Sequence, residues 1–138
     1  MDLLRHPTLI RVCQIATGVL FAFAGLAKVG DPASFAAQVH NFRLVPVALE
    51  NLVAMTLPWV EIVTALALVL GLRARAAAWL ATASMAAFTV AVVLALVRGL
   101  DIECGCFGTA DASRVGVMKV LQNVGFLAVA WVASLRAR

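Results

Sequence analysis

Four long apolar segments constrain the fold of this 138-residue chain more than any other feature. A helix needs about 20 apolar residues to cross the roughly 30 Å of hydrocarbon in a bilayer, so segments of this length predict membrane-spanning helices. The composition agrees, because 64% of the residues are hydrophobic and only 13% are charged. We predict a single all-α transmembrane domain covering residues 1–138, an integral membrane four-helix bundle. Its spans are 12–29, 47–72, 76–97 and 116–135.

The residues between the first two predicted spans favour a short helix along the membrane surface. The stretch 33–42 places Phe35, Val39 and Phe42 on one face of a helix. It is too short to cross the bilayer, and His40 would be costly inside the hydrocarbon. We therefore expect a short interfacial helix here, with His40 as an interface residue rather than a ligand.

The basic residues lie at the ends of the apolar segments and form no run or patch. The net charge of +4 therefore does not indicate a nucleic-acid partner. We interpret these side chains as membrane-interface anchors and residues 1–11 as a basic leader. The positive charges of the loops are nearly balanced, but the very short turn with Arg73 and Arg75 favours the cytoplasm for that side. The termini are thus expected to be cytoplasmic, in the cell (inner) membrane.

One four-residue repeat on the third predicted span is typical of close helix packing. Alanines recur at every fourth position and offer a flat surface on which a neighbouring helix can pack. The alanines of this stripe are Ala83, Ala87, Ala91 and Ala95.

The polar loop 98–114 carries Cys104 and Cys106, with one glycine between them. A structural zinc site needs four Cys or His ligands, and no histidine lies near in the sequence, so no metal is expected. A disulfide across one residue closes a small ring and should be strained and easily reduced, which suits thiol–disulfide transfer. The alternative is two surface cysteines with no shared role. The third cysteine, Cys13, is interpreted as a small buried apolar residue.

The second predicted span contains one carboxylate well inside its apolar run, Glu61. Such a residue usually faces the bundle interior and has a partner there. Two interpretations stay open. Glu61 could make a structural contact, as an ion pair or as a neutral carboxyl bonded to a neighbouring helix. It could instead accept a proton or bind a polar group of a quinone.

Four stretches of the chain resemble the MauE branch of the DoxX-like integral membrane proteins. They are Gly25-Leu26-Ala27-Lys28 with Asp31-Pro32 and Phe35, then Leu44-Val45-Pro46, then Leu57-Pro58-Trp59-Val60-Glu61, and finally Cys104-Gly105-Cys106-Phe107-Gly108. The resemblance implies a four-helix membrane bundle that is associated with thiol–disulfide chemistry. It also implies that the protein acts together with thioredoxin-like partners in the cell envelope.

The leading hypothesis is a membrane thiol–disulfide oxidoreductase. An extracytoplasmic Cys104/Cys106 pair would exchange disulfides with a thioredoxin-like envelope protein or a cysteine-containing substrate protein. Electrons would pass to or from a quinone between the helices, with Glu61, together with Lys28 or Gln122, handling the protons. Two alternatives remain, a non-catalytic membrane subunit that docks a thioredoxin-like partner, and an oligomer that transports a small solute.

Overall fold

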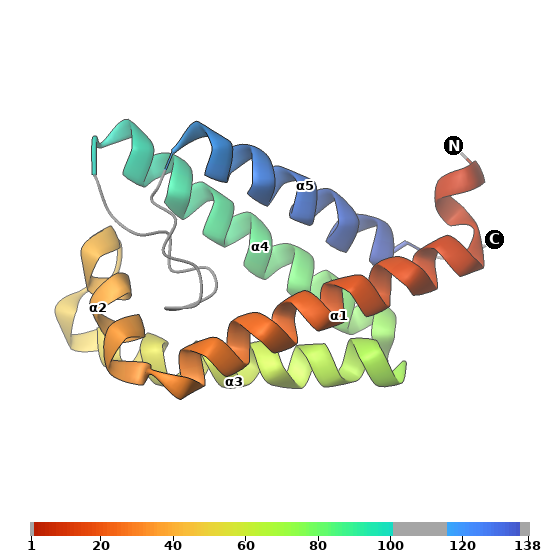
Figure 1. Ribbon diagram of the computed structural model, residues 1–138, viewed down its shortest axis with the longest axis horizontal. Coiled ribbons are helices and arrows are strands. Elements are labelled where there is room, and N and C mark those ends of the chain that lie inside the picture. The colour runs from red at the N-terminus through yellow and green to blue at the C-terminus, as the bar shows by residue number, and fades with distance from the viewer. Residues whose placement is uncertain (1, 101–115, 136–138) are drawn as a thin grey trace.

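The computed structural model describes residues 2–100 and 116–135. Within them every regular element is a helix, which confirms the predicted all-α class. Figure 1 shows that the long helices run along the length of the molecule, whereas a short helix crosses one end of it. After a 3-10 helix at Asp2–Arg5, the elements are α1 (Pro7–Gly30), α2 (Pro32–Phe42), α3 (Val47–Leu70), α4 (Ala74–Val97) and α5 (Val117–Ala133).

Three of these helices are long enough to cross a membrane. Helices α1, α3 and α4 each have 24 residues and are strongly apolar. Helix α5 is apolar as well but has 17 residues, so at 1.5 Å per residue it is about 26 Å long, slightly less than the roughly 30 Å of hydrocarbon. The described residues therefore support three spans by length, and a fourth crossing by α5 is left as a proposal.

Helix α1 begins earlier than the predicted span. Pro7 occupies the first helical position, where its missing N–H costs nothing. The His6 side chain accepts a hydrogen bond from the Thr8 N–H at 3.3 Å and caps the helix. The predicted leader at residues 1–11 is thus wrong for residues 7–11. Arg11 does not mark the end of the helix, because its side chain reaches across to α3.

Helices α1 and α3 pack closely because two glycines of α1 face α3. A Cβ built on Gly18 would lie 2.8 Å from a methyl group of Val69. A Cβ built on Gly25 would lie 3.0 Å from the Pro58 carbonyl oxygen. Without side chains at these points the two backbones can approach each other, as small residues allow in membrane helix pairs.

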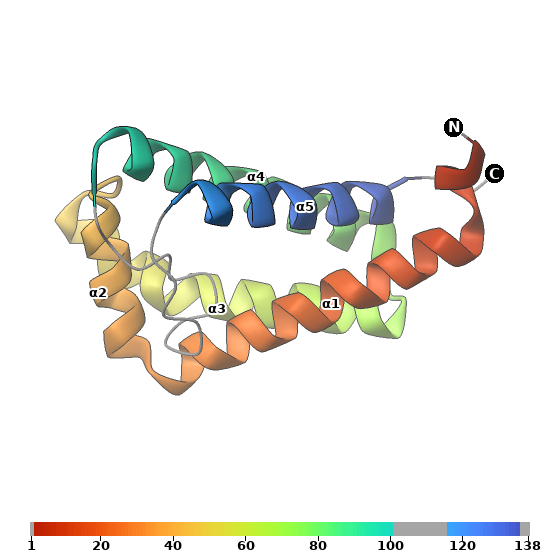
Figure 2. The same ribbon diagram turned by 45° about the horizontal axis from the view of Figure 1, so that its top comes forward.

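The bundle has two layers, with α1 beside α3 and α4 beside α5 (Figure 2). A cluster of buried side chains that includes Phe21, Leu68 and Met85 joins the layers. Helix α2 packs mainly against α3 and buries Phe35 and Phe42. This confirms the short helix that was predicted between the first two spans, and its position along a membrane surface stays a prediction.

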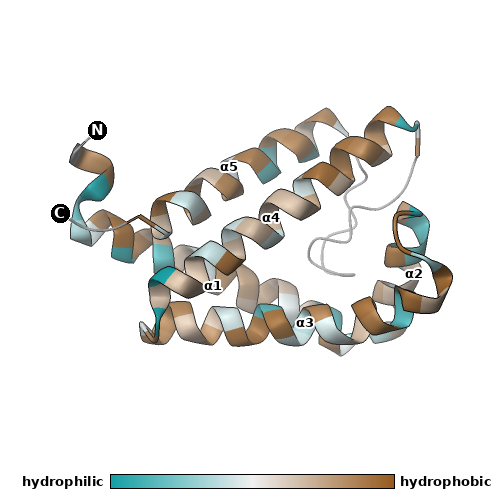
Figure 3. Cartoon of the chain, turned by 180° about the vertical axis from the view of Figure 1, so that it is seen from behind, coloured by the Kyte–Doolittle hydropathy of each residue, from teal (hydrophilic) through white to brown (hydrophobic). Residues whose placement is uncertain are grey.

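The surface of the bundle is more apolar than a soluble protein tolerates. Large side chains along the outer faces of the helices are exposed, for example Phe23, Leu52 and Trp59. Figure 3 shows brown, hydrophobic residues along much of the length of the helices. Several polar side chains are buried instead, including Gln14 and Asn123. An exposed apolar surface of this extent marks a partner or membrane surface. Together with three helices of spanning length, it indicates a membrane protein.

Two arginines satisfy the carbonyl ends of helices to which they do not belong. Arg11, on α1, donates to the Leu68 carbonyl at 2.7 Å and to the Val69 carbonyl at 2.6 Å, at the end of α3. Arg75, on α4, donates to the Ser134 carbonyl at 3.2 Å, at the end of α5. The last carbonyls of a helix have no partner within it, so these contacts fasten the helices together at the end of the bundle opposite α2.

Two further side chains also donate hydrogen bonds to carbonyls at the ends of other helices. Gln14 donates to the Ala133 carbonyl of α5 at 3.2 Å. Arg98, just after α4, donates to the Phe42 carbonyl at 3.3 Å and to the Arg43 carbonyl at 3.4 Å, where α2 ends. Arg98 therefore ties the end of α2 to the end of α4.

The predicted alanine stripe on α4 does not form one packing face. Ala95 is buried and Ala91 is half-buried, but Ala83 and Ala87 are exposed. Successive residues of a helix are about 100° apart, so a repeat of four residues drifts by about 40° at each step and winds round the helix. The face of α4 that packs instead carries the buried residues Ala78, Ala81, Met85, Thr89, Val92 and Ala95.

Candidate functional site

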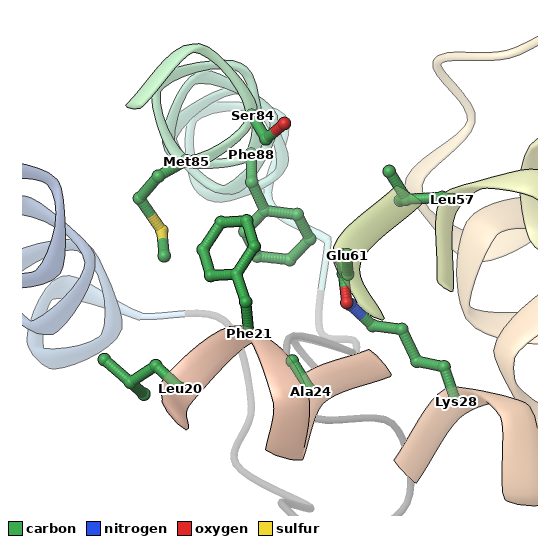
Figure 4. A pocket seen from close by; sticks show the side chains of 9 residues that line it. All are labelled: Leu20, Phe21, Ala24, Lys28, Leu57, Glu61, Ser84, Met85 and Phe88. Carbon is green, nitrogen blue, oxygen red and sulfur yellow. The ribbon is translucent and has the colours of Figure 1, made fainter. Parts of the chain in front are cut away.

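A buried ion pair joins α1 to α3. The Lys28 ammonium lies 2.6 Å from Glu61 Oε1, and the two side chains are 3% and 11% exposed. Figure 4 shows the Lys28 side chain reaching across from α1 to the carboxylate. Charges inside a membrane bundle are costly unless they pair, so they mark functional or structural contacts.

The close approach of the two helices places this pair. Gly25 and Lys28 lie three residues apart on α1, and Pro58 and Glu61 lie three residues apart on α3. Residues three apart share a helix face. The two helices run antiparallel, since Gly18 faces Val69 whereas Gly25 faces Pro58. Lys28 therefore begins beyond Pro58, and its long side chain reaches back along α3 to Glu61.

The second carboxylate oxygen of Glu61 has no hydrogen-bond partner within the described residues, although it is buried. Glu61 is one of the residues that line a cavity of about 50 Å³, which has room for a few water molecules. Phe21 of α1 and Phe88 of α4 form walls of this cavity, and Ser84 lies on the α4 side (Figure 4). Buried polar atoms are nearly always hydrogen-bonded, so this oxygen is an exception among the described residues.

The Lys28 ammonium also contacts α2. It lies 5.1 Å from the centre of the Phe35 ring, within the range of a cation–π interaction. Lys28 therefore touches three elements, its own helix, α3 through Glu61 and α2 through Phe35. A change at the ion pair would therefore also alter a contact that α1 makes with α2, the short helix at the end of the bundle.

Two lysines predicted as interface anchors are buried. Lys28 is 3% exposed and Lys119, near the start of α5, is 4% exposed. Lys119 donates to Gln122 Oε1 at 3.0 Å. The anchor interpretation is wrong for both residues, because each ammonium finds an oxygen acceptor within the protein and need not reach the membrane surface.

The predicted proton-handling residues divide into two groups. Glu61 and Lys28 are in direct contact. Gln122 lies on α5 beside Lys119, is exposed, and is not among the residues that line the cavity at Glu61. The structure therefore brings two of the three residues together.

Cys104 and Cys106 lie outside the described residues. The described chain on either side is Leu100, which packs against the buried cluster that contains Phe42 and Val92, and Gly116, which precedes α5. Both flanks lie at the same end of the bundle as α2 (Figure 1). The third cysteine, Cys13, is half-buried and packs against the cluster joining the two layers.

Two contributors to the site were not predicted from sequence. Phe35 was expected only as part of an apolar face, yet its ring also holds the Lys28 ammonium. Ser84 lines the cavity, and its only sequence signal is a polar residue within an apolar run. Neither pattern indicates which helix the side chain will face, so only the packing of the helices identifies them.

The chain matches the sequence profile of the family described as "Methylamine utilisation protein MauE" over residues 6–136. It is 34% identical over 130 residues to "Methylamine utilization protein MauE" of Paracoccus denitrificans, covering 94% of this chain and 70% of that protein. It is 33% identical over 132 residues to the protein of the same name from Methylorubrum extorquens, covering 95% of this chain and 71% of that protein.

A third relative of that name, from Methylophilus methylotrophus, is 30% identical over 123 residues, covering 88% of this chain and 65% of that protein. No solved structure matches the chain. The profile match covers nearly the whole chain, including α1 with Lys28 and α3 with Glu61. The chain therefore belongs to the MauE family.

Proposed function

We propose that this protein is a membrane thiol–disulfide oxidoreductase that acts through Cys104 and Cys106. Its partner would be a thioredoxin-like envelope protein or a cysteine-containing substrate protein. The names of its relatives support a role as an accessory membrane protein in methylamine utilisation. The single structural observation that carries the proposal is the buried Lys28–Glu61 pair, whose two residues line a cavity inside the bundle.

The exchange is balanced in electrons and protons. A thiolate of the partner attacks one sulfur of the Cys104–Cys106 disulfide and releases the other as a thiolate. The partner's second thiolate then breaks this mixed disulfide, so that the partner is oxidised and Cys104 and Cys106 are reduced. The reverse direction uses the same steps, and the reduction potentials of the two pairs decide which one runs.

Restoring the disulfide removes two electrons and two protons from Cys104 and Cys106. A quinone could accept them, because its reduction to a quinol takes up two electrons and two protons. The residues at the ion pair fit such a group. Glu61 Oε2 is a buried acceptor without a partner in the described part of the chain, and the Lys28 ammonium has further N–H donors besides the one bonded to Glu61 Oε1. Glu61 would hold and transfer the proton.

The same proposal includes a topology. The start of α1 and the end of α5 lie at the same end of the bundle (Figure 1), as a fourth crossing by α5 would require. We place the termini and the Arg73/Arg75 turn in the cytoplasm and the loop with Cys104 and Cys106 outside the inner membrane. This orientation would give the cysteines access to envelope partners and to an oxidising compartment.

Trapping the mixed disulfide tests the function directly. Cys104→Ala and Cys106→Ala each leave one thiol that cannot be resolved internally, so at least one variant should accumulate a covalent adduct with an envelope thioredoxin-like protein. Cys13→Ala is the control and should trap nothing. If neither variant forms an adduct and the dependent pathway survives the double variant, the protein is the non-catalytic docking subunit instead.

The role of Glu61 is tested separately. Glu61→Gln keeps the shape and hydrogen bonding of the side chain but cannot hold a proton, so quinone-linked turnover should fall by about 100-fold or more. Glu50→Gln removes a carboxylate that bonds His40 at the protein surface and should leave turnover unchanged. Unchanged turnover in Glu61→Gln would reject the proton role.

The orientation is tested with a membrane-impermeant thiol reagent on intact, reduced cells. We expect Cys104 and Cys106 to be labelled without lysis. Labelling that requires lysis would place the loop in the cytoplasm and reverse the proposed topology.

A further inference from the structure

Three arginines gather around the short turn between α3 and α4. Arg73 lies in the turn and Arg75 near the start of α4. Arg11 reaches the same place from α1, because its guanidinium bonds carbonyls at the end of α3. It lies 3.6 Å from the position that a Cβ on Gly71, inside the turn, would occupy. Folding therefore assembles an arginine cluster, Arg11, Arg73 and Arg75, from two distant parts of the chain.

The members of the arginine cluster differ in how many of their donors are used. Arg11 bonds two backbone carbonyls with its terminal nitrogens. Arg75 is exposed and donates through Nε alone, to the Ser134 carbonyl at 3.2 Å. Arg73 is exposed too, and within the described residues its side chain makes no hydrogen bond. A guanidinium has five N–H donors, so most donors of Arg73 and Arg75 remain available to a ligand.

The positive charge of the arginine cluster is not balanced within the described part of the chain. The ion pairs there join Lys28 to Glu61 and His40 to Glu50, and neither includes a member of the cluster. Guanidinium groups gathered around one turn repel one another. An anion from outside the described chain would remove this repulsion and use the vacant donors at the same time.

The surroundings of the turn favour a lipid as the source of that anion. Helices α3 and α4 are both long enough to cross a membrane, so the turn between them lies at a bilayer surface, where lipid phosphates are found. Two large apolar side chains are exposed there, Leu70 at 64% and Leu72 at 63%. A small soluble anion gains nothing from leucines, whereas the acyl chains of a lipid can cover them.

We propose that the arginine cluster binds the headgroup phosphate of an anionic phospholipid. Arg73 and Arg75 would bond the phosphate oxygens, since a guanidinium can donate two parallel hydrogen bonds to such a group. Leu70 and Leu72 would contact the acyl chains. A zwitterionic headgroup also carries an ammonium, and no carboxylate pairs with the cluster in the described residues, so the site should prefer a net negative lipid. The inference is independent of the proposed disulfide exchange.

Lipid binding to the purified protein in neutral detergent micelles tests the proposal. The probes are phosphatidylglycerol and phosphatidylcholine with identical acyl chains, and free glycerophosphoglycerol as a headgroup without chains. A ligand that binds only the folded state raises the thermal midpoint, so the midpoint is measured against the concentration of each probe. Phosphatidylglycerol should bind at least about fivefold more tightly than phosphatidylcholine, and the free headgroup should have no effect at the same concentration.

Two results of this titration would overturn the proposal. Equal affinities for the two lipids would show that the cluster does not recognise net negative charge. A free headgroup that acts as strongly as the whole lipid would make the turn a site for a soluble anion, and the leucines would then have no part in it.

Substitution of Arg73 locates the site. Arg73→Gln should weaken phosphatidylglycerol binding about fivefold, the contribution expected of one arginine beside an anionic lipid. Arg73→Lys retains the charge and should recover most of the affinity. The matched control is Arg43→Gln, because Arg43 is also exposed and left-handed, with φ 53° against 45° at Arg73, but lies at the opposite end of the bundle. Unchanged binding in Arg73→Gln, or an equal loss in Arg43→Gln, would reject the arginine cluster as the lipid site.

Discussion

The two ends of the bundle use charge in different ways. At the end opposite α2, the guanidinium groups of Arg11 and Arg75 meet backbone carbonyls, which are the atoms that a helix end leaves without partners. Near the α2 end, Lys28 meets Glu61, and one carboxylate oxygen has no partner in the described residues.

This difference distinguishes contacts that hold the helices together from a contact that could belong to a functional site. The arginine contacts bond backbone carbonyls at the ends of α3 and α5, and they suit a permanent connection between the helices. The lysine contact leaves one buried acceptor without a partner in the described residues, and both residues of the pair line a cavity. Buried polar atoms without partners are rare in native proteins and call for an explanation of this kind.

The largest expected effect breaks the ion pair on one side. Glu61→Leu would leave the Lys28 ammonium buried without its carboxylate, which should lower the free energy of unfolding by about 3–5 kcal/mol. Combining it with Lys28→Met should recover most of this loss, because no buried charge then remains. Denaturant titration in mixed micelles measures both. A double variant as unstable as the sum of the single variants would show that the two residues do not act as a pair.

A smaller effect is expected where α1 and α3 touch. Gly25→Ala adds a Cβ that would lie 3.0 Å from the Pro58 carbonyl oxygen, so it should destabilise the protein by about 1–3 kcal/mol. The same change at Gly125 meets nothing within 4 Å and should stabilise α5 by about 0.5–1 kcal/mol, because alanine favours a helix over glycine. Thermal unfolding of the two variants gives the signs, and equal shifts would contradict the close approach.

Substitution of Arg11, at the end of the bundle opposite α2, should lower the free energy of unfolding by a similar or smaller amount. Arg11→Lys retains the charge but cannot bond both the Leu68 and Val69 carbonyls as the guanidinium does. The loss should be about 1 kcal/mol. Arg73→Lys, in the exposed turn between α3 and α4, is the matched control with no expected change. If both variants unfold at the wild-type temperature, the Arg11 contacts do not fasten α3.

The smallest effect is expected at the surface pair between α2 and α3. His40 Nδ1 lies 2.9 Å from Glu50 Oε1, and the His40 side chain is 60% exposed. The Glu50 side chain is 13% exposed, but its partner is largely in solvent and a glutamine can still bond the imidazole. Glu50→Gln should therefore change the unfolding free energy by less than about 1 kcal/mol. A larger loss would mean that this contact, rather than the buried face of α2, holds that helix in place.

Helices were predictable from sequence because long apolar runs have few other folds open to them. The spans predicted at 47–72 and 76–97 match α3 (Val47–Leu70) and α4 (Ala74–Val97) to within about two residues. The family resemblance to MauE proteins is confirmed, whereas the wider grouping with DoxX-like proteins stays a prediction. The start of α1 was missed because Arg11 resembles a residue outside a span, and only contact with the end of α3 explains its position.

The site was predictable only in part. Glu61 was recognisable because a carboxylate within an apolar run needs a partner, and Lys28 was named beside it. What sequence could not give is the choice between Lys28 and Gln122, since that depends on which faces of α1, α3 and α5 meet. The cavity at Glu61 was equally hidden, because its walls come from residues of α1, α3 and α4 that are far apart in the chain.

The sequence separation of the ion pair has a consequence for biosynthesis. Lys28 precedes Glu61 by 33 residues, so at translation rates of about 5–20 residues per second the lysine is made about two to seven seconds before its carboxylate. During that interval the ammonium near the end of α1 must remain at the membrane surface, as lysine side chains at helix ends do. Burial of Lys28 therefore waits for α3, which makes the first and third helices a unit that assembles only after both have left the ribosome.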